Sequence, residues 1–188
     1  MKKMMTGFIG MDFQRGLNLL KDYSEDDKVH SKLDFSGRST FNGMKFIGIK
    51  TNCTMKELSK KMSGDFEKIR KYADENKDAI KGDFFSIYHK WDMANGKVSY
   101  TSGVSVNNEI SNLPTEFIKG EIPNTGIYSI KHTGPYLHLG NAWGTLYNMQ
   151  RAKTFKMNKK VDPFEVYHNL PGEVDDRELI TEVHFPVK

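Results

Sequence analysis

The stretch TGIYSIKHTGPYLHLGNAWGTLY, residues 125–147, contains a strand pattern, a turn and a helix pattern in close succession. Its first part alternates between apolar and polar residues from Ile127 to His132, as a half-buried strand does. Gly134-Pro135 then ends the alternation, and a proline can occupy the first turn of a helix without losing a hydrogen bond. After this break, apolar residues recur at steps of three and four and share one helical face: Leu139, Ala142, Trp143 and Leu146.

The chain after about residue 43 repeats this strand, turn, helix, strand and strand plan twice. FSIYH, residues 85–89, lies over FEVYH, residues 164–168, at a sequence offset of 79 (164 − 85). Val104 lies over Val183 at the same offset, and Ile49-Lys50 lies over Ile130-Lys131 at an offset of 81. Because the offset hardly drifts across a half, the pattern favours a duplication over coincidence.

The repeat predicts an α+β fold built from two β-α-β-β units. The expected strands cover residues 46–51, 84–91, 98–106, 126–132, 164–168 and 178–186, and the expected helices cover 54–76 and 137–153. Thr54-x-x-Glu57 is a capping-box pattern that opens the first of these helices. Residues 107–124 are expected to be a crossover. Two such units predict a curved antiparallel or mixed sheet layer with both helices on one face and an open ligand cleft on the other.

Residues 1–39 are expected to lie outside the main domain, which spans residues 40–188. Phe8, Phe13, Leu17 and Leu20 form one stripe of a helix whose propensity several glycines weaken. Such a stripe needs either a second chain or the domain's own surface to cover it, which leaves a homodimer open. Residues 24–39 lack periodicity and are expected to be a linker.

The length, charge and cysteine content of the chain exclude several classes of protein. The chain has 188 residues, 37% of them hydrophobic, which is enough for one main domain. Its net charge of +4 comes from basic residues scattered among nearly as many acids, so direct binding to nucleic acid is not expected. A single cysteine, Cys53, excludes an internal disulfide, and no apolar run reaches the length of a membrane span. We therefore expect a cytoplasmic location.

Strand alternation sorts the candidate site residues onto two faces. The apolar repeat mates Phe85, Ile87, Phe164 and Val166 are taken to mark the face under the helices. The residues expected on the open face are Ser86, Tyr88, Glu165, Tyr167, Ile180, Glu182 and His184. Two acids among aromatic rings would suit a hydrophobic cation, because rings attract cations and a carboxylate supplies the opposite charge.

Histidine and loop motifs give no second kind of site. His89 and His168 are expected on the core side, pointing away from His184, and no HxH, HExxH or cysteine-rich spacing occurs. The sequence therefore predicts no metal site and no cofactor. No glycine-rich phosphate loop or GxSxG nucleophile motif is present either.

Three motifs resemble the GyrI-like effector-binding domain of multidrug-responsive and AraC-type transcription regulators: GPYLHLGNAWGTLY, residues 134–147, PFEVYHN, residues 163–169, and ITEVHFPV, residues 180–187. The resemblance covers about residues 43–188. It implies the architecture above and a ligand contact at Glu165. Tyr167, Trp143, Tyr147, Tyr88 and Glu182 are further candidates for the ligand site, although Trp143 and Tyr147 could equally belong to the core. GMDFQRGLNLLKDY, residues 10–23, resembles the closing helix of a polyketide-cyclase/START-like domain.

The favoured function is a stand-alone binding protein for hydrophobic, cationic small molecules. An alternative, also implied by the resemblance, is a hydrolase that opens strained cyclopropane-bearing compounds with Glu165 as general base. A protein-inhibiting module ranks last because the net charge does not suggest an acidic decoy. Control of transcription would need a regulator partner, since residues 1–42 offer at most one helix.

Overall fold

The structure is a computed structural model that describes residues 2–77, 79, 80, 82–107, 110 and 112–188. In the first helix it describes side chains only at residues 9, 10 and 12–26, so the predicted contribution of Phe8 to the apolar stripe lies outside the described residues. The elements in order are α1 Lys2–Asp26, β1 Lys32–Phe41, β2 Met44–Thr54, α2 Leu58–Glu75, β3 Phe84–Asp92, β4 Lys97–Ser105, β5 Ile118–Ile122, β6 Thr125–Thr133, the 3-10 turn η1 Tyr136–His138, α3 Gly140–Arg151, β7 Phe164–Tyr167, the 3-10 turn η2 Asp176–Glu178 and β8 Ile180–Val187.

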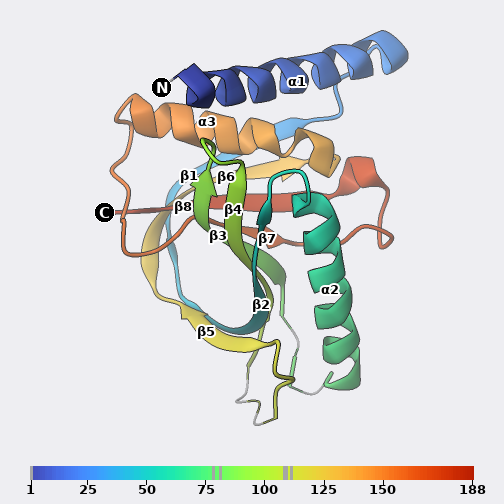
Figure 1. Ribbon diagram of the computed structural model, residues 1–188, viewed down its shortest axis with the longest axis vertical. Helices are drawn as coiled ribbons and strands as arrows, with labels where there is room; N and C mark the ends of the chain where they lie inside the picture. Colours follow the sequence, from blue (N-terminus) through green and yellow to red (C-terminus); the bar gives the residue numbers. More distant parts are fainter. Residues whose placement is uncertain (1, 78, 81, 108–109, 111) are drawn as a thin grey trace.

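In the described part of the chain, eight antiparallel strands form one sheet in the order β1-β6-β8-β7-β3-β4-β2-β5. Figure 1 shows that this sheet is strongly curved. Helix α2 packs on β2 and β4, and α3 packs on β6 and β8. Both helices lie on the same face, so the predicted α+β architecture is confirmed. Strands β3 and β7 run through the middle of the sheet between the two helix-covered halves.

Two strands were missed in the sequence. Residues 32–39, expected to be a linker, belong to β1, which pairs with β6, and β5 lies inside the expected crossover and pairs with β2. The two pairs form one long ribbon, because Phe41 pairs with Thr125 and Met44 pairs with Ile122 on either side of a bend. Gly43 sits at this bend with φ +85°, and a Cβ there would lie 3.0 Å from the backbone of Asn124.

This ribbon curls the sheet around an apolar core on the helix-free face. Phe85, Ile87, Phe164 and Val166 cluster there with buried residues of the ribbon, Phe46, Ile122 and Ile127. The prediction that the first four lie under the helices is therefore wrong. Alternation correctly indicated that these side chains are buried, but the curl of the sheet buries them instead of the helices. A hollow of about 260 Å³, lined in part by Phe46, Ile87 and Ile122, opens beside this cluster.

The residues under the helices form two further clusters. Ile47, Ile49 and Val104 pack against Ile69 of α2. Ile130, Val183 and Phe185 pack against α3 and the residue before it. The predicted stripe contributes Leu139, Ala142 and Leu146 as buried residues and Trp143 as a partly buried one.

Helix α2 begins four residues after the start of the capping-box pattern. The carboxylate of Glu57 accepts hydrogen bonds from the backbone N and the hydroxyl of Thr54, at 3.1 Å and 2.7 Å. Thr54 itself still pairs with Lys97 in the sheet. Because the residue remains in β2, it cannot also cap the helix, which starts at Leu58.

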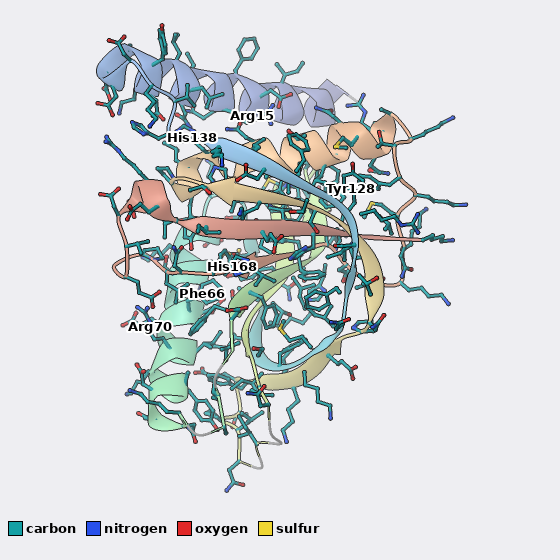
Figure 2. The ribbon with its side chains drawn as sticks, turned by 180° about the vertical axis from the view of Figure 1, so that it is seen from behind. Arg15, Phe66, Arg70, Tyr128, His138 and His168 are labelled. Atoms are coloured by element: carbon teal, nitrogen blue, oxygen red, sulfur yellow. The ribbon has the colours of Figure 1, made fainter. Side chains whose placement is uncertain are left out.

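Helix α1 lies along the outer side of α3 (Figure 1). The guanidinium of Arg15 donates to the carbonyl of Gly140 at 3.4 Å, and a Cβ at Gly144 would clash with the same guanidinium. The ring of His138, in η1, lies 2.7 Å from the carboxylate of Asp22. Figure 2 shows Arg15 and His138 between α1 and the rest of the protein. Among the described residues, no helix is long and apolar enough to span a membrane.

Candidate functional site

The carboxylate of Glu165 lies on the helix-covered face and is surrounded by side-chain donors. Glu165 is only 2% exposed. The hydroxyl of Tyr167 donates to Oε2 of Glu165 at 2.6 Å, and the hydroxyl of Tyr88 donates to the same oxygen at 3.1 Å. The indole Nε1 of Trp143 in α3 donates to Oε1. We call these four residues the glutamate cage.

The duplication explains why two tyrosines meet at one carboxylate. Tyr88 and Tyr167 are repeat mates at the offset of 79, and so are Ser86 and Glu165. Ser86 and Glu165 are also direct partners across the β3–β7 pair. The axis that relates the two halves therefore passes between Ser86 and Glu165, and each half contributes one tyrosine to the cage.

The two helices follow the same correspondence between the halves. Met62 in α2 and Trp143 in α3 are matched at the offset of 81 (143 − 62). Trp143 donates to Glu165, while the hydroxyl of Ser86 donates to the sulfur of Met62 at 3.9 Å. In the second half, an indole N–H therefore lies over a carboxylate. In the first half, a less polar thioether lies over a hydroxyl.

Aromatic rings form the walls around the cage. The ring of Tyr88 meets Trp143 edge to face with 5.1 Å between centroids, and the ring of Phe66 meets Tyr167 in the same way at 5.5 Å. Tyr136 of η1 lies 5.8 Å from Tyr167, centroid to centroid. The walls close over the acid. Two hollows of about 390 and 260 Å³ lie beside Cys53 and along β5, and neither is lined by a cage residue.

Burial dominates the protonation chemistry of the cage. Desolvation raises the pKa of Glu165, and the hydrogen bonds from Tyr167, Trp143 and Tyr88 offset only part of this rise. Desolvation, followed by the charge of Glu165, raises the pKa values of Tyr88 and Tyr167 well above the usual tyrosine value. Both phenols therefore stay protonated at neutral pH and act as donors to the carboxylate.

The raised pKa of Glu165 predicts a pH-dependent effect on stability. A carboxyl group with a higher pKa in the folded state stabilises the fold at pH values below its unfolded pKa, and this contribution is lost as pH rises through the folded pKa. Glutamine does not titrate. We therefore expect the free energy of unfolding of Glu165→Gln, relative to that of the wild type, to increase from pH 4 to pH 8 in urea titrations. A difference that stays constant or decreases over this range would contradict the assignment.

The structure brings together most of the predicted site residues. Glu165, Tyr167, Tyr88 and Trp143 form the cage, and Tyr147 lies 6.0 Å from Trp143, ring to ring, with 45% of its surface exposed. The strand residues Glu165, Tyr167 and Tyr88 lie on the helix-covered face instead of the predicted helix-free face. The reason is that Glu165 pairs with Val183, which packs under α3.

Glu182 does not belong to this site. It pairs with Val166 and so lies on the opposite face of the sheet from Glu165. Its Oε2 lies 3.3 Å from Nε2 of His168 and 3.8 Å from Nε2 of His184. The prediction that His168 points away from His184 is therefore wrong. Among the described residues, no group of three or more His, Cys, Asp or Glu side chains could hold a metal ion.

Sequence reasoning missed several wall residues: Phe66, Tyr136 and Met62. Ser86 was assigned to the same face as Glu165, but its place at the axis was not recognised. The signal for Met62 was the offset of 81 that also aligns the first strands of the two halves. For Tyr136, the signal was its position directly after the Gly-Pro break, where the chain turns back towards the sheet.

The fold is shared by other solved structures, three of which are described next. The EcmrR chain in the cryo-EM structure of an EcmrR–DNA complex aligns with a TM-score of 0.66 and 17% identity over 94% of this chain and 66% of its own length. The crystal structure of the EcmrR C-terminal domain aligns with a TM-score of 0.59 and 18% identity over 84% of this chain and 98% of that domain. SAV2435 bound to tetraphenylphosphonium aligns with a TM-score of 0.58 and 13% identity, over 82% and 94% of the two chains.

At these identities the structural similarity shows the fold alone. The chain spans just under two-thirds of the length of the EcmrR chain in the DNA complex. None of the curated proteins compared with this chain matches it. A family model, described as the GyrI-like small molecule binding domain, matches residues 39–188. That match runs from within β1 to the last residue and leaves α1 outside.

Proposed function

This chain belongs to the family of GyrI-like small molecule binding domains, and we propose that it captures hydrophobic, cationic small molecules at the glutamate cage. The observation that carries the proposal is a buried carboxylate without a counter-ion. The donors that Glu165 has in the described residues are two phenols and an indole, all neutral. Within the described residues, the shift of its pKa comes from burial and from these three hydrogen bonds, with no contribution from a charged group.

A buried acid in this state favours a cationic ligand for two reasons. Moving a carboxylate out of water costs free energy that neutral donors only partly restore, so a positive charge beside it is strongly attracted. Each aromatic ring of the wall adds about 0.5–2 kcal/mol of attraction to a cation over its face. The flat rings also supply the apolar surface that a hydrophobic ligand needs.

Entry requires side chains to move. Tyr136 and Tyr147 are 37% and 45% exposed and form the outer rim of the aromatic walls, whereas Glu165 is buried beneath them. We propose that these rim rings move aside and that the ligand lies against the indole of Trp143, with its positive charge beside Glu165. The same ligand class is found in SAV2435, whose structure contains tetraphenylphosphonium and which has the same fold.

Titration calorimetry with two related probes tests this function. Tetraphenylphosphonium is the cation, and triphenylphosphine oxide is a neutral analogue with similar rings. We expect Glu165→Gln to weaken binding of the cation at least about tenfold, equivalent to about 1.4 kcal/mol, and to leave binding of the neutral analogue unchanged. The reason is that the amide keeps the shape of the acid but removes its charge.

Glu182→Gln is the matched control, because it removes an acid from the opposite face of the sheet. Its affinity for the cation should equal that of the wild type. Equal losses in both variants would point to a general effect of net charge, and an unchanged affinity in Glu165→Gln would refute the cage as the ligand site.

Hydrolysis is the second function that we propose for the same residues. It is favoured by the raised pKa of Glu165, because a general base works best when its pKa approaches the working pH. Tyr88 or Tyr167 would donate a hydrogen bond to the charge that develops on the substrate. Turnover of a strained cyclopropane-bearing compound that disappears in Glu165→Gln would favour this function over capture alone.

A regulatory role would act through a partner. EcmrR, which has the same fold over part of its length, is seen in a complex with DNA. We propose that the present chain senses a ligand and passes the signal to a regulator protein, without a direct contact to nucleic acid.

A further inference from the structure

The hollow of about 260 Å³ on the helix-free face is separate from the glutamate cage. It opens between β5, the end of β3 and the loop before β7. Its floor is apolar and is built from buried residues of three strands, Phe46, Ile87 and Ile122. The volume lies just below the range of about 300–1,000 Å³ that holds drug-sized ligands, so the hollow suits a smaller molecule.

A β-bulge in β3 shapes one wall of this hollow. The register of β3 against β4 shifts between Tyr88 and Lys90, which makes His89 an extra residue in the strand. A bulge of this kind re-aims a side chain. Nε2 of His89 lies 2.8 Å from the hydroxyl oxygen of Thr101, and its Nδ1 lies 2.7 Å from Oδ2 of Asp162. Because both ring nitrogens are engaged, this wall is held in place before any ligand arrives.

Positive charge exceeds negative charge among the side chains that line the hollow. Lys50 in β2 is the cross-strand partner of Thr101, so both side chains lie on the helix-free face. Lys160 comes from the loop before β7. In the described part of the chain, neither lysine has an ion-pair partner. The carboxylate of Asp162, by contrast, is already engaged by His89.

Two further charged residues of the lining, both in β5, leave this balance unchanged. Lys119 and Glu121 flank Gly120, whose cross-strand partner is Phe46 of the floor. Strand alternation therefore places both side chains on the opposite face of β5, and their charges have opposite signs. The hollow thus offers two unpaired cations and one engaged acid beside an apolar floor.

We infer that this hollow is a second ligand site and that it takes a small monocarboxylate with an apolar body. The apolar body lies against Ile87 and Ile122, and the carboxylate lies between the ammonium groups of Lys50 and Lys160. Hydrogen bonds between ionised partners are about twice as strong as those between neutral ones. A single negative charge matches the excess of one positive charge, two lysines against one acid. The inference uses no residue of the cage, so it stands whether or not the cage binds cations.

Titration calorimetry of the full chain with cinnamate and cinnamamide tests this site, because the two probes share their apolar body and differ in charge. We expect the wild type to bind cinnamate at least about tenfold more tightly than the amide. Lys50→Met and Lys160→Met keep an unbranched side chain and remove the charge. Each should weaken binding of cinnamate about tenfold and leave binding of cinnamamide unchanged, with circular dichroism confirming the fold.

Lys45→Met is the matched control. Lys45 is an exposed lysine of the same strand as Lys50, but it pairs with Glu121 and lies on the other face of β2. Its loss should not change the affinity for cinnamate, and neither should Glu165→Gln, which alters only the cage. Four results would overturn the inference: no binding of cinnamate by the wild type at millimolar concentration, equal affinities for the two probes, equal losses in Lys45→Met and Lys50→Met, or loss of cinnamate binding in Glu165→Gln.

Discussion

A Phe164→Ala variant is expected to lose about 3–5 kcal/mol of the free energy of unfolding, the usual cost of removing a buried aromatic ring. Phe164 is fully buried, and its ring lies 4.9 Å from that of Phe41 and 4.8 Å from that of His184. It sits inside the core that the β1–β2 and β5–β6 ribbon encloses. Because the ribbon pairs with strands on both sides, the walls cannot collapse into the cavity, and we expect a loss near the upper end of the range.

Urea denaturation followed by circular dichroism measures this loss. Phe35→Ala is the control, because Phe35 is a phenylalanine of the sheet that is 60% exposed, and its removal should change stability by less than about 0.5 kcal/mol. A loss below about 1 kcal/mol for Phe164→Ala would show that the helix-free face does not hold a packed core.

Trp143→Ala is expected to weaken binding of tetraphenylphosphonium about thirtyfold, which corresponds to about 2 kcal/mol for a desolvated cation–ring contact. Two physical effects act in the same direction. The ring that meets Tyr88 edge to face is removed, which opens the wall to water. The indole donor to Glu165 is also lost, and this favours the protonated, uncharged form of the acid.

The measurement is calorimetric titration at pH 8, where the carboxylate is most fully ionised. Tyr128→Ala is the matched control, because Tyr128 also packs in the α3 cluster, but its ring stacks on Phe155 at 4.8 Å and belongs to no part of the cage. If Tyr128→Ala weakens binding as much as Trp143→Ala does, the effect comes from the stability of α3. If neither variant weakens binding, Trp143 is not part of the ligand site.

Much of the fold could be predicted because its signals are local or repeated. The offset of 79 identified the two halves, and the hairpin β3–β4 and helix α3 followed from alternation and from steps of three and four along the chain. The edge strands β1 and β5 were not predicted, because few of their side chains are buried and the apolar alternation is weak. In β1, for example, no residue is fully buried. Their pairing partners lie far away in sequence, since β1 pairs with β6 and β5 pairs with β2.

The cage shows a different limit. The sequence grouped Glu165 with Tyr88 and Tyr167, because strand alternation fixes which residues share a face. It could not decide which of two buried faces the helices cover, and Phe164 and Val166 looked like residues under a helix. The same error placed Glu182 beside Glu165. Only the pairing of β7 with β8, read together with the packing of α3, separates the two acids.

The pseudo-twofold axis between Ser86 and Glu165 determines how many acids the site contains, and so how much positive charge a ligand could bring. Two separate, identical half-chains would have to place the same residue twice at such an axis, giving either two touching carboxylates, one of which would hold a proton, or two hydroxyls and no charge. Joining the halves in one chain lets the two positions differ, and here one is an acid and the other is not. The cage therefore contains a single carboxylate. For the proposed cationic ligand, we therefore expect one positive charge to be balanced, whereas a dication of the same shape would carry a second charge to a site with a single acid.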